Sequence, residues 1–165
     1  MCVITEKPIW LPEMVDCSGD IDEVFAHLYE IFCRDFKQGP VRLNNLQVWY
    51  NRKIGEKGFE EGFWHLIERE EKSQRVRYFD PRRAERLPWL RPSIDYYLDT
   101  EVRFFEYREF NKIFAYVWLY NFDYLAVFIK REHNFGNVYF LISAHYIDGN
   151  RKRRQLLDKY REVSR

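Results

Sequence analysis

Four consecutive segments rich in aromatic and β-branched residues fill most of the second half of the chain. Only short turn-like sequences separate EVRFFEYREF (101–110), KIFAYVWLY (112–120), DYLAVFIKR (123–131) and NVYFLISAHYI (137–147). Such residues fit a pleated surface, and connections of hairpin length join antiparallel neighbours. The sequence therefore predicts a four-stranded antiparallel sheet. The almost continuous apolar character of the second and fourth segments indicates a sheet that is covered on both faces or strongly curved.

Helical periodicity surrounds these strands. Apolar residues recur at spacings of three and four in four segments, which are residues 20–39, 59–70, 80–97 and 148 to the C-terminus. Asp20 or Ser18 is expected to cap the first helix, and Asp80 with Pro81 to begin the third. Pro88 and Pro92 are expected to kink or divide that third helix. The predicted class is α+β, a helical N-terminal part followed by the sheet, with helices packed on a face of it, and a C-terminal helix.

Two segments between the helices carry weaker patterns. Residues 41–52 (VRLNNLQVWYNR) alternate loosely and predict a short strand or extended segment. Residues 70–78 (EEKSQRVRY) predict a charged loop. No repeat or linker divides the 165 residues, so the chain is predicted to form a single domain.

The composition restricts the class of protein. The net charge is +1, which gives no general signal for nucleic acid, although basic clusters occur at 80–92 and from Asn150 onward. Aromatic residues make up 19%, and they serve core packing unless they line a groove, where they can stack on bases. Cys2, Cys17 and Cys33 match no zinc or disulfide pattern and fit reduced thiols in the cytoplasm. No apolar run reaches the length of a membrane span, and no signal peptide is predicted.

Motifs for cofactors are missing from the sequence. It has no glycine-rich phosphate loop, no His-x-x-x-His, no cysteine pair at ligand spacing and no Gly-x-Ser-x-Gly elbow. Asp20, Asp22 and Glu23 form an acidic group, but the first turn of a helix explains it. The sequence therefore predicts no metal or nucleotide cofactor.

His65 is the first candidate for chemistry. It lies between Trp64 and Leu66 in the segment GFWHLIERE, with Glu61 and Arg69 each one helical turn away. Two interpretations stay open: a core histidine with a hydrogen-bond partner, or the titratable group of an active site.

A second set of candidates lies on the predicted strands. Ser143 and His145 are two residues apart and therefore share a face, and Lys130 and Arg131 end the preceding strand. If the last two strands pair, an imidazole, a hydroxyl and a cation would meet on one face. Such a set suits metal-free RNA cleavage, in which histidine moves protons and cations stabilise the phosphoryl oxygens.

Three stretches carry a resemblance to a known group of nucleases. GFWHLI, then DPRRAERLPWLRPSI, and finally YFLISAHYID before a basic helix resemble the nuclease-like domains of phage-associated proteins in the barnase–EndoU–colicin–RelE-like grouping. The resemblance covers about residues 57–160, so 57–165 is expected to form the nuclease-like core and 1–56 an N-terminal helical addition. It implies a toxin-type ribonuclease that needs no metal and that is neutralised by an antitoxin or immunity protein.

The resemblance and the strand pattern together give the predicted site. The catalytic candidates are His65, Ser143, Lys130 and Arg83, and the candidates for substrate binding are Arg69, Arg86, Arg131, His145 and Tyr120. His65 would be the acid/base group and Lys130 the cation on the sheet, while Arg83 and Arg86 would contact phosphate or support the site.

Three functions therefore stand as hypotheses. The first is a metal-independent ribonuclease, a toxin or phage-related effector that acts on tRNA or mRNA in the cytoplasm. The second is a non-catalytic RNA- or protein-binding module of the same fold. The third is a structural or immunity-type partner whose aromatic surface meets another chain.

Overall fold

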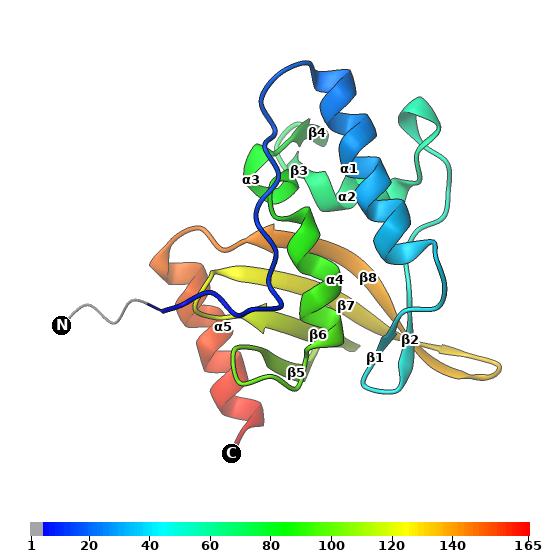
Figure 1. The fold of residues 1–165 in the computed structure, drawn as a ribbon. Helices are drawn as coiled ribbons and strands as arrows, with labels where there is room; N and C mark the ends of the chain where they lie inside the picture. Colours follow the sequence, from blue (N-terminus) through cyan, green and yellow to red (C-terminus); the bar gives the residue numbers. More distant parts are fainter. Residues whose placement is uncertain (1–4) are drawn as a thin grey trace.

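The fold is seen in a computed structural model that describes residues 5–165 (Figure 1). The helices are α1 (Ile21–Phe36), the 3-10 turn η1 (Glu56–Gly58), α2 (Glu61–Ile67), α3 (Pro81–Ala84), α4 (Leu87–Asp95) and α5 (Asn150–Val163). The strands are β1 (Arg42–Leu43), β2 (Leu46–Trp49), β3 (Glu68–Glu71), β4 (Val76–Phe79), β5 (Arg103–Glu109), β6 (Lys112–Leu119), β7 (Tyr124–His133) and β8 (Gly136–Tyr146). The predicted α+β class is confirmed.

The main sheet is larger than the sequence predicts. Its strand order is β1-β2-β8-β7-β6-β5, and β5 to β8 form the expected antiparallel meander. The prediction of a four-stranded, purely antiparallel sheet is wrong, because β2 adds to the free edge of β8 in parallel, with Gln47 opposite Val138. The partners β2 and β8 are some 90 residues apart in the chain, so no short connection in the sequence marks their pairing. The strands of a hairpin, in contrast, are joined by a short turn that the sequence shows.

Helices cover both faces of this sheet (Figure 1), which is one of the two arrangements that its apolar second and fourth segments indicate. Ala115, Val117 and Leu119 of β6 pack into the larger core with α1, α2 and α4. The alternate residues Tyr116 and Trp118 pack into a smaller core with α5. This two-sided burial explains why β6 is apolar at almost every position.

The helix that the sequence places at 59–70 is shorter than expected. α2 ends at Ile67, where Glu68 adopts extended backbone angles, and Glu68–Glu71 forms β3. β3 pairs with β4 in a separate two-stranded hairpin, with Arg69 opposite Tyr78. The loop predicted for 70–78 is therefore wrong. The hairpin is charged and mostly exposed, so it lacks the apolar alternation by which a strand is recognised.

Capping residues explain where the helices begin. The Asp20 carboxylate accepts hydrogen bonds from the backbone amides of Asp22 and Glu23, and Asp80 does the same for Arg82 and Arg83. The predicted helix at 80–97 is divided at residues 85–86, just before Pro88, and Pro92 lies inside α4. Of the two caps predicted for the first helix, Asp20 or Ser18, Asp20 is the one at the start of α1.

Replacing Asp20 with alanine is expected to reduce the free energy of unfolding by about 1 kcal/mol, because two amides at the start of α1 lose their acceptor. Urea denaturation of the two proteins measures it. Asp22→Asn is the matched control. Asp22 lies in the first turn of α1, is exposed, and its carboxylate pairs with Lys57 of η1, so this substitution is expected to leave the free energy of unfolding almost unchanged. An equal loss in both variants would contradict the assignment of the cap.

Two negative findings apply to residues 5–165. No helix in this part of the chain is both long and apolar enough to cross a membrane. No group of three or more His, Cys, Asp or Glu side chains in it is arranged to hold a metal ion. Cys17 and Cys33 are free thiols, while Cys2 lies outside the described residues.

Candidate functional site

The candidate site is a cleft of about 370 Å³ between α5 and the sheet. Strands β6, β7 and β8 form its floor, and one side of α5 forms its wall. Apolar side chains line much of it. The polar side chains that line it are Tyr116, Ser143, His145, Lys152, Gln155 and Lys159. A mostly apolar hollow with a few convergent polar groups is the usual form of a ligand site.

Ser143 and His145 lie on the floor of this cleft, which we call the α5 cleft. They face Val127 and Leu125 across the β7–β8 ladder, and the Ser143 Oγ lies 3.4 Å from the His145 Nδ1. The predicted pairing of the last two strands and the shared face of these two side chains are both present.

A β-bulge determines which face they share. The ladder shifts register between Val127 and Phe128, so that Phe128 opposes Leu141 while Val127 opposes Ser143. Before the bulge, the odd-numbered Leu141 points into the larger core; after it, the odd-numbered Ser143 points into the α5 cleft. Bulges re-aim side chains in this way. Without it, Ser143 and His145 would point to the opposite face.

His145 is neutral at neutral pH. Burial first, and then the positive charges of Arg83 and Lys152, lower the pKa of its imidazole to about 4, against a smaller opposing effect of the Asp80 carboxylate. A neutral imidazole is the form that accepts a proton. It also accepts or donates one hydrogen bond at Nδ1, where the Ser143 hydroxyl lies.

The α5 wall supplies the cations of the cleft. Lys152 and Lys159 are seven residues apart, about two helical turns, and so lie on one side of α5. The Lys159 ammonium donates to Glu109 Oε2 at 2.7 Å and lies 5.8 Å from the ring centre of Tyr116. Burial opposes its charge, but the hydrogen bond to Glu109 raises the pKa of Lys159 above its ordinary value. Burial also raises the pKa of Tyr116, which keeps its phenol protonated.

Contacts at both ends hold α5 against the sheet. Leu156 is buried, Tyr107 donates to Glu162 at 2.9 Å, and Arg153 pairs with Asp123. Together with the Lys159–Glu109 hydrogen bond, these contacts hold the wall of the cleft in place.

The arginines of α3 take different positions. Arg83 is mostly buried, donates to the carbonyl of Glu68 at 2.6 Å, and adds positive potential at His145. Burial lowers the pKa of Arg83, and the nearby charge of Arg69 lowers it further against the pull of Asp80. Arg86 instead lies over the rings of Trp89 and Tyr146, at 5.5 and 4.6 Å.

His65 belongs to a separate polar cluster. Its Nε2 lies 3.9 Å from Glu61 Oε2, and Arg77 donates to the same carboxylate at 3.2 Å. Burial and the charge of Arg77 lower the pKa of His65, against the opposing effect of Glu61. No hydrogen bond or ion pair within residues 5–165 joins His65 to the Ser143–His145 pair. The predicted site combines His65 with Ser143 and His145, but in the structure His65 lies beside Glu61 and does not line the α5 cleft.

Lys130 lies on the opposite face of the sheet from the α5 cleft. It pairs with Tyr139 across the ladder and sits 3.1 Å from Glu106, which also accepts from the Tyr139 hydroxyl. The sequence offered Lys130 or Arg131 as the cation on the face of Ser143. Lys130 is not on that face, because the bulge moves Ser143 and not Lys130, whereas Arg131 is on it. The cations of the α5 cleft come from α5 instead.

Arg131 and Tyr120 are on the cleft side of the sheet but outside the cleft lining. The Arg131 guanidinium lies 3.9 Å from the ring centre of Phe140. Arg131 is four residues further along β7 than Val127, a distance of about 13 Å along the strand. Tyr120 donates to the carbonyl of Thr100, and its ring lies 4.0 Å from the Arg103 guanidinium.

The predicted site residues do not include Lys152, Gln155 or Lys159. The sequence indicates the basic tail only as a cluster, and the seven-residue spacing of Lys152 and Lys159 is the signal that could have identified these two lysines. Only the packing of α5 on the sheet shows that these lysines face Ser143 and His145.

Comparison with known proteins gives no match to any protein-family model, to any curated protein or to any solved structure.

A pH titration of stability tests the environment of His145. In the unfolded chain its imidazole binds a proton near pH 6.5, and in the folded chain only near pH 4. Between these values the unfolded state binds more protons, so stability falls as the pH falls. We expect the wild type to lose on the order of 2 kcal/mol more than His145→Leu between pH 6.5 and 4. His27→Gln, at an exposed site, should follow the wild type; identical curves for all three proteins would contradict the assignment.

Proposed function

We propose that the protein is a metal-independent ribonuclease, and that the α5 cleft is its active site. The observation that carries the proposal is the Ser143–His145 pair at 3.4 Å, facing Lys152 and Lys159 across the cleft. The cleft holds a proton acceptor, a hydroxyl and cations, which are the groups that transesterification of RNA requires.

The proposed reaction uses the 2′-hydroxyl of the substrate. His145 takes its proton, the 2′-oxygen bonds to phosphorus, and the bond from phosphorus to the 5′-oxygen breaks. The Tyr116 phenol gives a proton to the departing 5′-oxygen, and the products are a 2′,3′-cyclic phosphate and a 5′-hydroxyl. Lys152 and Lys159 stabilise the negative charge on the phosphoryl oxygens. Ser143 orients the His145 imidazole through its hydrogen bond.

Substrate would itself improve His145 as a base. Arg83 and Lys152 are the charges that lower its pKa beyond the effect of burial. A phosphate bound beside them would offset their positive potential, and the pKa of His145 would rise toward neutrality. A base with a pKa closer to the working pH transfers protons more effectively.

In this proposal the protein is a toxin or phage-related effector acting on tRNA or mRNA in the cytoplasm. A neutralising antitoxin or immunity protein belongs to the same proposal. The resemblance of GFWHLI, DPRRAERLPWLRPSI and YFLISAHYID to toxin-type nuclease domains supports these details.

The second candidate function is a non-catalytic RNA-binding module. What favours it is the number of exposed rings and cations outside the cleft, among them Phe110 and Phe135, which are 81% and 64% exposed. Such a module would bind RNA with a steep dependence on salt and cut none.

Incubation of the purified protein with total tRNA and mRNA in EDTA separates the two. We expect cleavage by the wild type and fragments that carry a cyclic phosphate. Salt-dependent binding without any cleavage would contradict the ribonuclease and support the module.

A further inference from the structure

A cleft forms where two hairpins of the sheet separate. The β6–β7 ladder ends at Phe114 and Ile129, whereas the β5–β6 hairpin continues to Lys112 and the β7–β8 hairpin to His133. The hairpins therefore extend past their shared ladder, and a cleft of about 490 Å³ lies between them. Its basic side chains are Arg108, Lys112, Lys130 and Arg131, and its acidic one is Glu132.

This hairpin cleft is the first of three adjoining hollows. Asn137 lines both it and a second hollow of about 250 Å³, which also contains Arg42 and Phe135. Gln47 lines both the second hollow and a third of about 500 Å³, which contains Arg52. Seven basic and two acidic side chains line the three hollows together, in a chain whose net charge is only +1.

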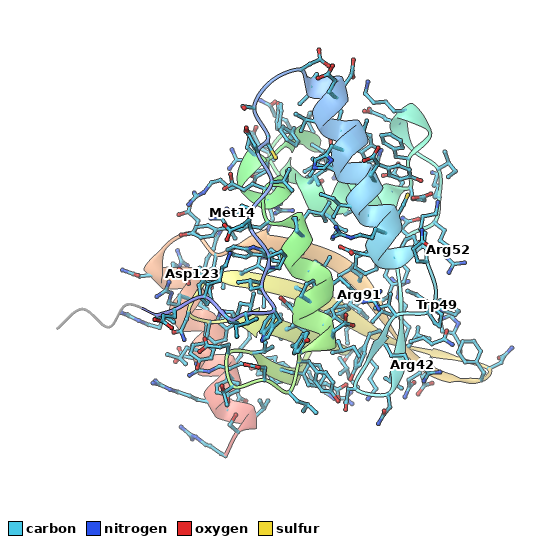
Figure 2. The ribbon with its side chains drawn as sticks, viewed as in Figure 1. Met14, Arg42, Trp49, Arg52, Arg91 and Asp123 are labelled. Carbon is cyan, nitrogen blue, oxygen red and sulfur yellow. The ribbon has the colours of Figure 1, made fainter. Side chains whose placement is uncertain are left out.

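An aromatic cluster stands beside these hollows. The Trp49 ring lies 4.4 Å from His133 and 5.7 Å from Phe135, and the His133 and Phe135 rings are stacked at 5.8 Å. Phe135 is 64% exposed. Figure 2 shows Trp49, Arg42 and Arg52 along the side of the molecule formed by β1 and β2, near the projecting β7–β8 hairpin. Exposed rings beside cations are what bases and phosphates of a single strand require.

We propose that the three hollows, with the Trp49–His133–Phe135 cluster, form a docking track for single-stranded RNA. The choice of RNA as the ligand rests on the proposed function, and the track adds the path that the RNA strand follows over the protein surface. The track meets the α5 cleft, because Phe114 lines the α5 cleft and its ladder partner Ile129 lines the hairpin cleft. Single-strand sites of this kind cover on the order of 4–16 nucleotides.

Single-stranded RNA fits these features better than other anionic partners. A strand threads through successive concave hollows, and its unpaired bases stack on rings; a duplex hides its bases. A membrane surface would meet a convex basic face with apolar residues, whereas these cations line depressions.

Fluorescence anisotropy with a labelled, unstructured 12-nucleotide RNA tests the track. All proteins carry His145→Gln so that the RNA stays intact. We expect Phe135→Ala to weaken binding about 5- to 150-fold through lost stacking. We expect Arg131→Gln to reduce the slope of log affinity against log salt by about 0.7. Tyr96→Ala is the matched control, since Tyr96 is 48% exposed and stacks on Trp10 outside the track.

Three results would overturn the track. They are unchanged binding by both track variants, equal affinity for a duplex of the same sequence, and sedimentation with phosphatidylserine vesicles without RNA binding. The ribonuclease itself is assayed separately with the wild type. Cleavage together with unchanged Phe135→Ala binding overturns only the track. Binding that depends on Phe135 without cleavage supports the track and contradicts the ribonuclease.

Discussion

Replacing His145 with glutamine is expected to lower kcat/KM for RNA cleavage by about 10²- to 10⁴-fold. Glutamine keeps a hydrogen-bonding group beside Ser143 but cannot take up the 2′-hydroxyl proton. Because the free enzyme's imidazole has a pKa of about 4, wild-type kcat/KM should fall only as the pH drops toward that value. Initial rates on one RNA substrate across this pH range measure both effects.

His65→Gln is the matched control for this prediction. His65 is also partly buried and also has a lowered pKa, but it contacts Glu61 and lies outside the α5 cleft. We expect it to leave cleavage close to the wild-type rate. If His65→Gln removed cleavage while a folded His145→Gln retained it, the active site would lie at α2 and the proposed cleft would be wrong.

Replacing Lys159 with glutamine is expected to reduce kcat about 10²- to 10³-fold with a smaller change in KM. Its ammonium faces Tyr116 in the α5 cleft, where charge develops on the phosphoryl oxygens and on the departing oxygen. A cation that acts mainly in the transition state affects kcat more than substrate binding. Steady-state kinetics on a short RNA separates the two constants.

Glu109→Gln tests whether the Lys159 effect is structural. This variant weakens the 2.7 Å hydrogen bond that holds Lys159 but leaves the cation in place. The pair is partly exposed, so we expect a loss of stability of about 1 kcal/mol or less and cleavage within the range of the wild type. An equal loss of kcat in both variants would assign Lys159 to holding α5 rather than to the reaction.

Local chemistry made part of the fold predictable. The four strands β5 to β8 follow from continuous aromatic and β-branched runs, and Asp20 and Asp80 are caps that sequence alone identifies. The loose alternation of residues 41–52 predicts a short strand, which is present as β2, but it does not indicate that β8 is the partner. The β3–β4 hairpin was missed because it carries no periodic apolar pattern.

The candidate site was predictable only in pieces. A spacing of two places Ser143 and His145 on one face, but a shift of one residue in register decides which face that is. The bulge beside Val127 makes that shift, and nothing in the sequence near it marks the position. For the same reason Lys130 was expected beside Ser143 and lies across the sheet from it.

The reaction proposed for the α5 cleft depends on the 2′-hydroxyl of the RNA and on His145. The most direct test is to incubate the wild type and His145→Gln with cellular RNA in EDTA, identify fragment ends by mass spectrometry, and repeat the reaction on an RNA methylated at the 2′-oxygen of the cut nucleotide. We expect 2′,3′-cyclic phosphate ends that disappear with His145→Gln and with the methylated RNA. Absence of cleavage in EDTA, or cleavage that persists at the methylated nucleotide, would contradict the proposed reaction.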